Sequence, residues 1–191
     1  VVKEGSIAFL RSKRGFWKNL RHDSYFDDNL NEYAAYQQKA ITQGGEDIYR
    51  HIPKCYGWQK TDIGMGLISD YYHKDGQPCI TLRAYLKENG YTDDIKEKLA
   101  IFADYLRDTG LLTKNIIPHN IVVASDGRLK LIDGIGASSP FNIARFSKRA
   151  RKKYIENRIK RMYFRLEWEM GEKDTRWEDI EKAHRAQKKQ A

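Results

Sequence analysis

The sequence predicts an α+β fold, on three observations. Short β-prone segments occur in two separate places along the chain, and capped amphipathic helices lie between and after them. The 191 residues suit one compact unit, and 40% hydrophobic residues are enough to fill a core. Charged residues make up 32% of the chain, and no run of 18 apolar residues occurs. We therefore expect a soluble protein without a transmembrane segment.

The first residues and the cysteines predict a cytoplasmic protein. Residues 1–5 have neither the apolar stretch nor the small-residue cleavage site of a signal peptide. Cys55 and Cys79 lack the spacing of a disulfide framework or of a zinc site, which suits a reducing compartment. We interpret both cysteines as small buried apolar residues.

The first half of the chain is predicted to form one long helix and two strands. The helix begins at Asp28, a residue type favoured at helix N-termini, and ends at Gly44-Gly45. Residues 54–58 and 66–72 are β-prone runs joined by a polar turn. The apolar face of the helix is expected to comprise Leu30, Tyr33, Ala34, Gln37, Ala40 and Ile41.

Cap residues predict three further helices. Thr81 begins a short one, and Thr92 caps a longer one that Gly110 ends. Near the C-terminus, Thr175 and Glu178 form a Thr-x-x-Glu capping box, which predicts a last short helix.

The positive charge of the chain is concentrated in one segment. The net charge is +9, and residues 141–165 contain ten Lys or Arg residues and one acid, Glu156. The segment predicts a long basic helix, because apolar residues recur in it at four- or five-residue steps. Its basic face is either simply solvated or a contact for nucleic acid, nucleotide or anionic lipid. The expected apolar positions are Phe146, Ala150, Tyr154, Ile159, Tyr163, Leu166 and Met170.

A predicted hairpin places two potential metal ligands near each other. Apolar runs at 121–124 and 129–132 are separated by Asp126-Gly127, which is typical of a two-residue β-hairpin. Folding back through this turn brings Asn120 and Asp133 to the same end of the hairpin. An amide oxygen and a carboxylate are hard ligands that suit Mg²⁺ carrying nucleotide phosphates. We therefore predict that these two residues bind a metal ion.

This arrangement resembles the catalytic loop and metal-binding segment of protein kinases, in which Asp-Leu-Lys-Pro-x-Asn precedes a hairpin that ends in Asp-Phe-Gly. Asn120 and Asp133 match the two metal ligands of that pattern. Asn115 stands at the position of the catalytic Asp, and Ile117 at that of the loop Lys. A neutral amide cannot accept the proton of a substrate hydroxyl, and Ile cannot neutralise charge on a transferred phosphoryl group.

A wider set of motifs is similar to the YrbL family of PhoP regulatory network proteins. The resemblance extends from about residue 28 to residue 166, and the basic segment after Pro140 fits it. The matching motifs are IPKCYG at 52–57, GMGLI at 64–68, DGQPCITL at 75–82, PHNIV at 118–122 and IDGIG at 132–136.

The resemblance implies an α+β, protein-kinase-like fold with a mostly helical C-terminal lobe and a truncated N-terminal lobe. Residues 1–72 would form the partial N-terminal lobe and hinge, and residues 73–191 the helical lobe. Glu32 would match the helix residue that pairs with a phosphate-binding Lys. That Lys would be Lys3 or, as we prefer, a residue upstream of Val1.

Three alternative functions follow, two from the resemblance and the third from the basic segment. The first is a bacterial regulatory pseudokinase with a degenerate site for Mg²⁺ and ATP, which implies a regulatory protein partner. The second is an active, atypical ATP-dependent phosphotransferase. The third is a polyanion binder that uses residues 141–165, with the kinase-like cleft vestigial.

Overall fold

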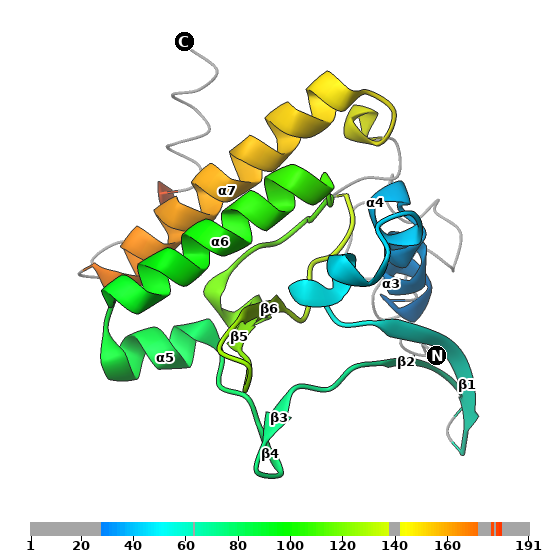
Figure 1. The fold of residues 1–191 in the computed structure, drawn as a ribbon, viewed down its shortest axis with the longest axis horizontal. Coiled ribbons are helices and arrows are strands. Elements are labelled where there is room, and N and C mark those ends of the chain that lie inside the picture. Colours follow the sequence, from blue (N-terminus) through cyan, green and yellow to red (C-terminus); the bar gives the residue numbers. More distant parts are fainter. Residues whose placement is uncertain (1–27, 63, 138–141, 172–176, 178, 181–191) are drawn as a thin grey trace.

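The computed structural model describes residues 28–62, 64–137, 142–171, 177, 179 and 180, and these form an α+β arrangement (Figure 1). The expected α+β class is therefore confirmed. The predictions made for Lys3 and for the capping box of Thr175 and Glu178 lie outside the described residues. Within the described ranges, no helix has the length and apolar character needed to cross a bilayer.

An antiparallel ribbon and the helix beside it form one side of the molecule. β1 (Cys55–Thr61) pairs with β2 (Gly64–Ser69), with Trp58 opposite Leu67. Helix α3 (Asp28–Tyr36) packs on this ribbon, where the rings of Tyr33 and Trp58 lie 5.7 Å apart. The two strands predicted here are confirmed, with shifted ends.

The long helix predicted from Asp28 to Gly44 is interrupted in the structure. Helix α3 ends at Tyr36, and a one-turn helix, α4 (Lys39–Thr42), follows. The break is held by Gln38, whose Nε2 donates to Ala35 O at 2.9 Å while its Oε1 accepts from Leu112 N at 2.8 Å. Consequently the buried residues are Ala35, Tyr36 and Ile41, whereas the predicted core residues Ala34 and Gln37 are exposed.

The two Thr-capped helices are confirmed. In α5 (Leu82–Asn89), Thr81 Oγ1 accepts from Ala84 N, and in α6 (Asp93–Thr109), Thr92 Oγ1 accepts from Ile95 N. Gly110 ends α6 in the left-handed conformation. Helix α6 supplies the centre of the core with the fully buried residues Ile95, Leu99, Phe102 and Leu106.

The predicted hairpin forms, with a longer loop. β5 (Ile121–Val123) pairs with β6 (Leu129–Leu131), and Ala124 N donates to Arg128 O. The loop therefore has three residues, ending at Gly127 with φ 77°, rather than the predicted two.

A second, small hairpin was not predicted. β3 (His73–Lys74) pairs with β4 (Gln77–Pro78) through Asp75 and Gly76, both of which have positive φ. The Asp-Gly dipeptide is the sequence signal for such a turn. Cys79 directly follows β4 and Cys55 begins β1, and both are half-buried free thiols, whereas the sequence predicts that they are buried.

The basic segment forms the longest helix, α7 (Lys148–Met170), preceded by the 3₁₀ turn η4 (Ile143–Arg145). Its buried residues Ile155, Ile159, Met162 and Leu166 follow the 3.6-residue period and pack against α5 and α6. The predicted apolar face is therefore only partly right. Phe146 precedes the helix and is 83% exposed, because η4 turns the chain before α7 begins.

His51 connects the first half of the chain to the β5–β6 hairpin. It follows the 3₁₀ turn η2 (Glu46–Arg50) and is 2% exposed. Its Nδ1 lies 2.7 Å from Leu129 O, and Leu131 N donates to His51 O at 2.8 Å. A carbonyl oxygen only accepts, so Nδ1 carries the proton of a neutral imidazole. Burial lowers the pKa of His51 more than its hydrogen bond to Leu129 raises it.

Candidate functional site

The strand register brings the backbones of Asn120 and Asp133 to the same end of the β5–β6 hairpin. Ile121 is paired with Leu131, and Ile132 N donates to Asn120 O at 2.8 Å. Asn120 is the last residue of the 3₁₀ turn η3 (Pro118–Asn120), whose Pro118 presets the turn. The residue opposite Asn120 is thus the immediate neighbour of Asp133.

The side chain of Asn120 is buried, at 6% exposure, and has a fixed orientation. Its Nδ2 donates to the main-chain carbonyl of Asn115 at 3.2 Å. Because a carbonyl can only accept, this bond points the amide nitrogen toward the preceding loop and leaves Oδ1 on the other side. The oxygen of Asn120 is therefore oriented as an acceptor or as a ligand for a cation.

The carboxylate of Asp133 is exposed, and its Oδ1 accepts the main-chain N–H of Gly134. This bond fixes the start of the turn that follows β6. The carboxylate remains accessible to solvent, so it can contribute an oxygen to a hydrated cation without a large desolvation cost.

The segment after Asp133 pairs with the segment before Pro118. Lys114 N donates to Gly134 O, and Gly136 N donates to Leu112 O, both at 2.7 Å. A Cβ added to Gly134, whose φ is 93°, would lie 2.5 Å from Asn115 O. Only glycine allows this approach of two backbones, so the main chain of Asn115 is held against Asp133-Gly134.

Asn115 itself is half-buried. In the structure it is the main-chain carbonyl of Asn115, rather than its side chain, that accepts the bond from Asn120. The neutral side-chain amide has no basic group with which to take up a proton at neutral pH.

Helix α3 places Glu32 on the face that contacts this segment. A Cβ on Gly136 would lie 2.8 Å from Ala35 Cβ, so α3 packs directly against the glycine-containing segment. Glu32 is three residues before Ala35 and therefore shares its face. Burial, with a smaller contribution from the charge of Glu32, raises the pKa of Tyr36, whose hydroxyl donates to Pro53 O at 3.1 Å. Lys3, a predicted partner of Glu32, lies outside the described residues.

The donors fit a hydrated magnesium ion better than a protein-enclosed metal. Across the part of the chain that the structure describes, no group of three or more His, Cys, Asp or Glu side chains could hold a metal ion. Asn120 and Asp133 offer one amide oxygen and one carboxylate. Mg²⁺ is commonly bound through one or two such protein ligands, with water and phosphate oxygens completing an octahedron.

Neither of two hollows on the described surface is lined by Asn120 or Asp133. One, of about 220 Å³, is lined by Gln38, Gly110, Leu112 and Arg151 among others. The other is lined by residues of η2 and by His51, Ile101 and Lys130.

Lys130 is a buried cation that the sequence reasoning missed. It is 7% exposed, although it lies in a strand between two leucines. Its Nζ lies 5.4 Å from the ring centroid of Tyr72 and 3.6 Å from an oxygen of Asp126. The period-two alternation of Leu129, Lys130 and Leu131 predicts a solvent-facing Lys. In the structure its amine lies over the Tyr72 ring and donates to Tyr49 O at 3.4 Å.

The chain is similar in sequence to a protein kinase and to one protein family. The chain is similar to the serine/threonine-protein kinase OXI1 of Arabidopsis thaliana, with 29% identity over 104 residues, which cover 51% of this chain and 24% of that kinase. The match thus spans about a quarter of the length of that relative. Residues 12–167 match the family model described as PhoP regulatory network protein YrbL. Since the match covers most of its length, the chain belongs to the YrbL family of PhoP regulatory network proteins.

Proposed function

We propose that this protein is a kinase-like regulatory protein, a bacterial pseudokinase, that retains a degenerate site for Mg²⁺ and ATP. The observation that carries the proposal is that three segments pack against one another at the end of the β5–β6 hairpin where Asn120 and Asp133 lie. The loop that ends at Asn120 pairs with the segment after Asp133, and helix α3, which bears Glu32, lies against that segment. The similarity to a serine/threonine kinase supports the same interpretation.

Under this proposal the chain divides as a small kinase does. Residues 1–72 contribute a partial N-terminal lobe and hinge, to which α3, β1 and β2 belong. Residues 73–191 contribute the helical lobe, with α5, α6 and α7 around the β5–β6 hairpin. Asn120 lies directly before β5 of that hairpin, Asp133 lies two residues after β6, and α3 contacts the segment that follows Asp133.

The residues at the site favour nucleotide binding over phosphoryl transfer. Asn120 Oδ1 and the carboxylate of Asp133 would hold Mg²⁺, which supplies positive charge to nucleotide phosphates. Asn115 provides no general base, and Ile117 provides no cation for a phosphoryl group. A site of this kind can report nucleotide binding to a regulatory protein partner without efficient turnover.

The second candidate is an active, atypical phosphotransferase. The similarity to OXI1, a kinase by name, favours it, as does the presence of both proposed metal ligands. Loss of a general base removes about 10²–10⁴ in rate, which leaves slow transfer within reach because positioning and metal electrostatics do most of the work.

Thermal unfolding with ATP, with and without Mg²⁺, tests the proposed site. MgATP should raise the melting temperature of the wild-type protein, whereas ATP with a chelator should not. Asp133→Asn keeps an acceptor for Gly134 N and removes the charge, so it should abolish the shift. Asp126→Asn makes the same chemical change at the other end of the hairpin, where Asp126 accepts from Arg128 N, and should preserve the shift.

Phosphoryl transfer measured with excess protein separates the two candidates. The pseudokinase proposal predicts MgATP binding without transfer to protein or water above background. Transfer that depends on Asp133 would establish the phosphotransferase instead. An unchanged melting temperature in MgATP would refute both proposals about the site.

A further inference from the structure

Two large apolar side chains project from the turn that precedes the basic helix. Ile143 is 69% exposed and Phe146 is 83% exposed, and both belong to or adjoin η4. We call residues 142–153 the basic corner. Scattered exposed apolar residues are ordinary on protein surfaces, but here two of the most exposed ones are three residues apart on one turn.

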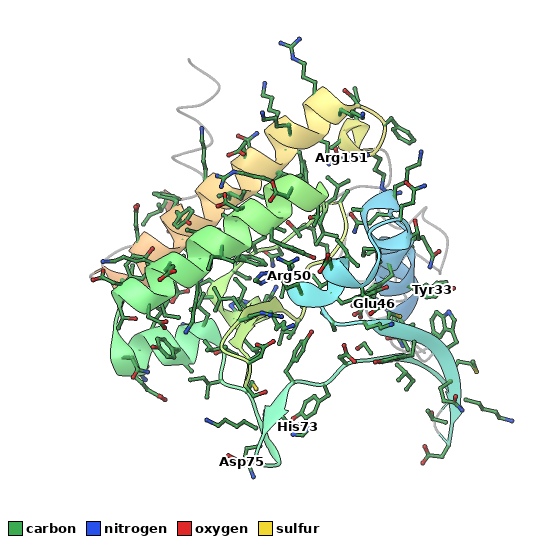
Figure 2. All side chains as sticks on the ribbon, in the orientation of Figure 1. Tyr33, Glu46, Arg50, His73, Asp75 and Arg151 are labelled. Atoms are coloured by element: carbon green, nitrogen blue, oxygen red, sulfur yellow. The ribbon has the colours of Figure 1, made fainter. Side chains whose placement is uncertain are left out.

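The turn that presents these residues is held by several hydrogen bonds. Asn142 Oδ1 accepts from Ala144 N at 3.0 Å, and Ser147 Oγ caps α7 by accepting from Ala150 N. Arg151 folds back from α7, donating from Nε to Ala144 O and from Nη2 to Arg145 O. Figure 2 shows Arg151 on the inner side of the corner, toward α4. Ile143 and Phe146 therefore stand on a fixed scaffold.

The first turns of α7 add a concentrated positive face. Lys148, Arg149, Lys152 and Lys153 are all exposed, and their spacing places them on one side of the helix. The first turn of α7 contains no acidic residue. Glu156, the one acid in this stretch, is paired with Arg107 at 2.8 Å.

This charge distribution does not stabilise the free protein. Cations near the start of a helix oppose its macrodipole, and adjacent like charges repel each other. The buried side of α7 already secures the helix through Ile155, Ile159 and Met162. Because these cations destabilise the start of α7 in the free protein, their placement indicates a partner that supplies negative charge.

We propose that the basic corner docks on an anionic phospholipid bilayer. The Lys and Arg side chains would interact with acidic headgroups, and Ile143 and Phe146 would insert at the boundary of headgroups and acyl chains. Charge complementarity alone fits any polyanion. The aliphatic Ile143 beside Phe146 favours lipid, because an aliphatic side chain offers nucleic acid neither a stacking plane nor a hydrogen bond.

Sedimentation of the 191-residue chain with lipid vesicles tests this proposal. The chain should pellet with vesicles of phosphatidylcholine and phosphatidylserine at about 7:3, and not with phosphatidylcholine alone. Replacing Lys152 and Lys153 with Gln should weaken partitioning about thirtyfold. Phe146→Ser or Ile143→Ser should weaken it about tenfold. None of these exposed changes should lower the melting temperature appreciably.

Matched changes elsewhere serve as controls. Lys60→Gln with Lys74→Gln removes the same charge from the two exposed hairpins, and Ile101→Ser removes an apolar residue that is 50% exposed on α6. Both should bind like wild type. The proposal is overturned if phosphatidylserine vesicles fail to bind the chain, or if controls and corner variants lose equal affinity. It is also overturned if a 20-nucleotide single strand binds tightly while the Phe146 and Ile143 changes leave vesicle binding intact.

Discussion

Replacing Gly134 with Ala should strongly destabilise the protein, because two separate costs meet at this residue. Its φ of 93° is a conformation that residues with a Cβ rarely adopt, and imposing it costs about 1–3 kcal/mol. The added Cβ would also lie 2.5 Å from Asn115 O and 3.1 Å from its carbonyl carbon. Relieving overlap with backbone adds about 1–3 kcal/mol.

Gly127→Ala is the matched control for this prediction. Gly127 has a φ of 77°, but a Cβ there would meet no atom within 4 Å. The Gly127→Ala variant therefore has the free-energy cost of a positive φ without the cost of atomic overlap. The difference between the two variants, about 1–3 kcal/mol, measures how tightly Asn115 is held against the segment after Asp133.

Urea unfolding followed by circular dichroism gives both free energies of unfolding. Gly134→Ala should lose about 2–6 kcal/mol, with a midpoint clearly below that of Gly127→Ala and an unchanged slope. Equal losses in the two variants would refute the close backbone approach. So would a Gly134→Ala protein as stable as the wild type.

The remaining predictions concern pH, catalysis and an ion pair. Burial lowers the pKa of His51, so below the unfolded-state pKa of about 6.5 the unfolded protein binds more protons than the folded protein. The free energy of unfolding should therefore be at its full value above pH 7 and decrease toward pH 5. Thermal unfolding at several pH values should show a smaller decrease in the His51→Gln variant. The double variant Asn115→Asp with Ile117→Lys restores a general base and a cation, and should raise the rate of phosphoryl transfer from ATP about 10²-fold or more in a phosphate assay. An unchanged rate would show that the site lacks further catalytic groups. Glu156→Gln breaks an exposed pair with Arg107 between α7 and α6, and should cost no more than about 1 kcal/mol; a larger loss in urea unfolding would contradict this.

The parts of the fold that were predictable are those that local chemistry determines. Thr81 and Thr92 cap their own helices, and Gly110 ends one in a left-handed conformation, so each signal lies within a few residues of its effect. The hairpin after Asn120 was predictable for the same reason. Its loop length was not, because Ala124 pairs with Arg128 only once the strands are in register.

The errors arise where distant segments decide the outcome. The first helix breaks because Gln38 binds the main chain of Leu112, far along the chain, which no helical periodicity reveals. The apolar face of α7 was misplaced because α5 and α6 select Ile155 and Met162 for burial. At the candidate site, spacing indicated that Asn120 and Asp133 are neighbours. The contact of Gly136 with Ala35, which positions α3, is visible only in the folded chain.

The most direct test of a joint metal site is a double-mutant cycle on the binding of Mn²⁺ and ADP, measured by electron paramagnetic resonance. The wild-type chain, Asn120→Ala, Asp133→Asn and the double variant are compared, with circular dichroism as the check on folding. If both residues hold one ion, each single change should abolish most of the binding, and the double variant should lose little more. Binding that survives both single changes, or losses that simply add, would contradict the account.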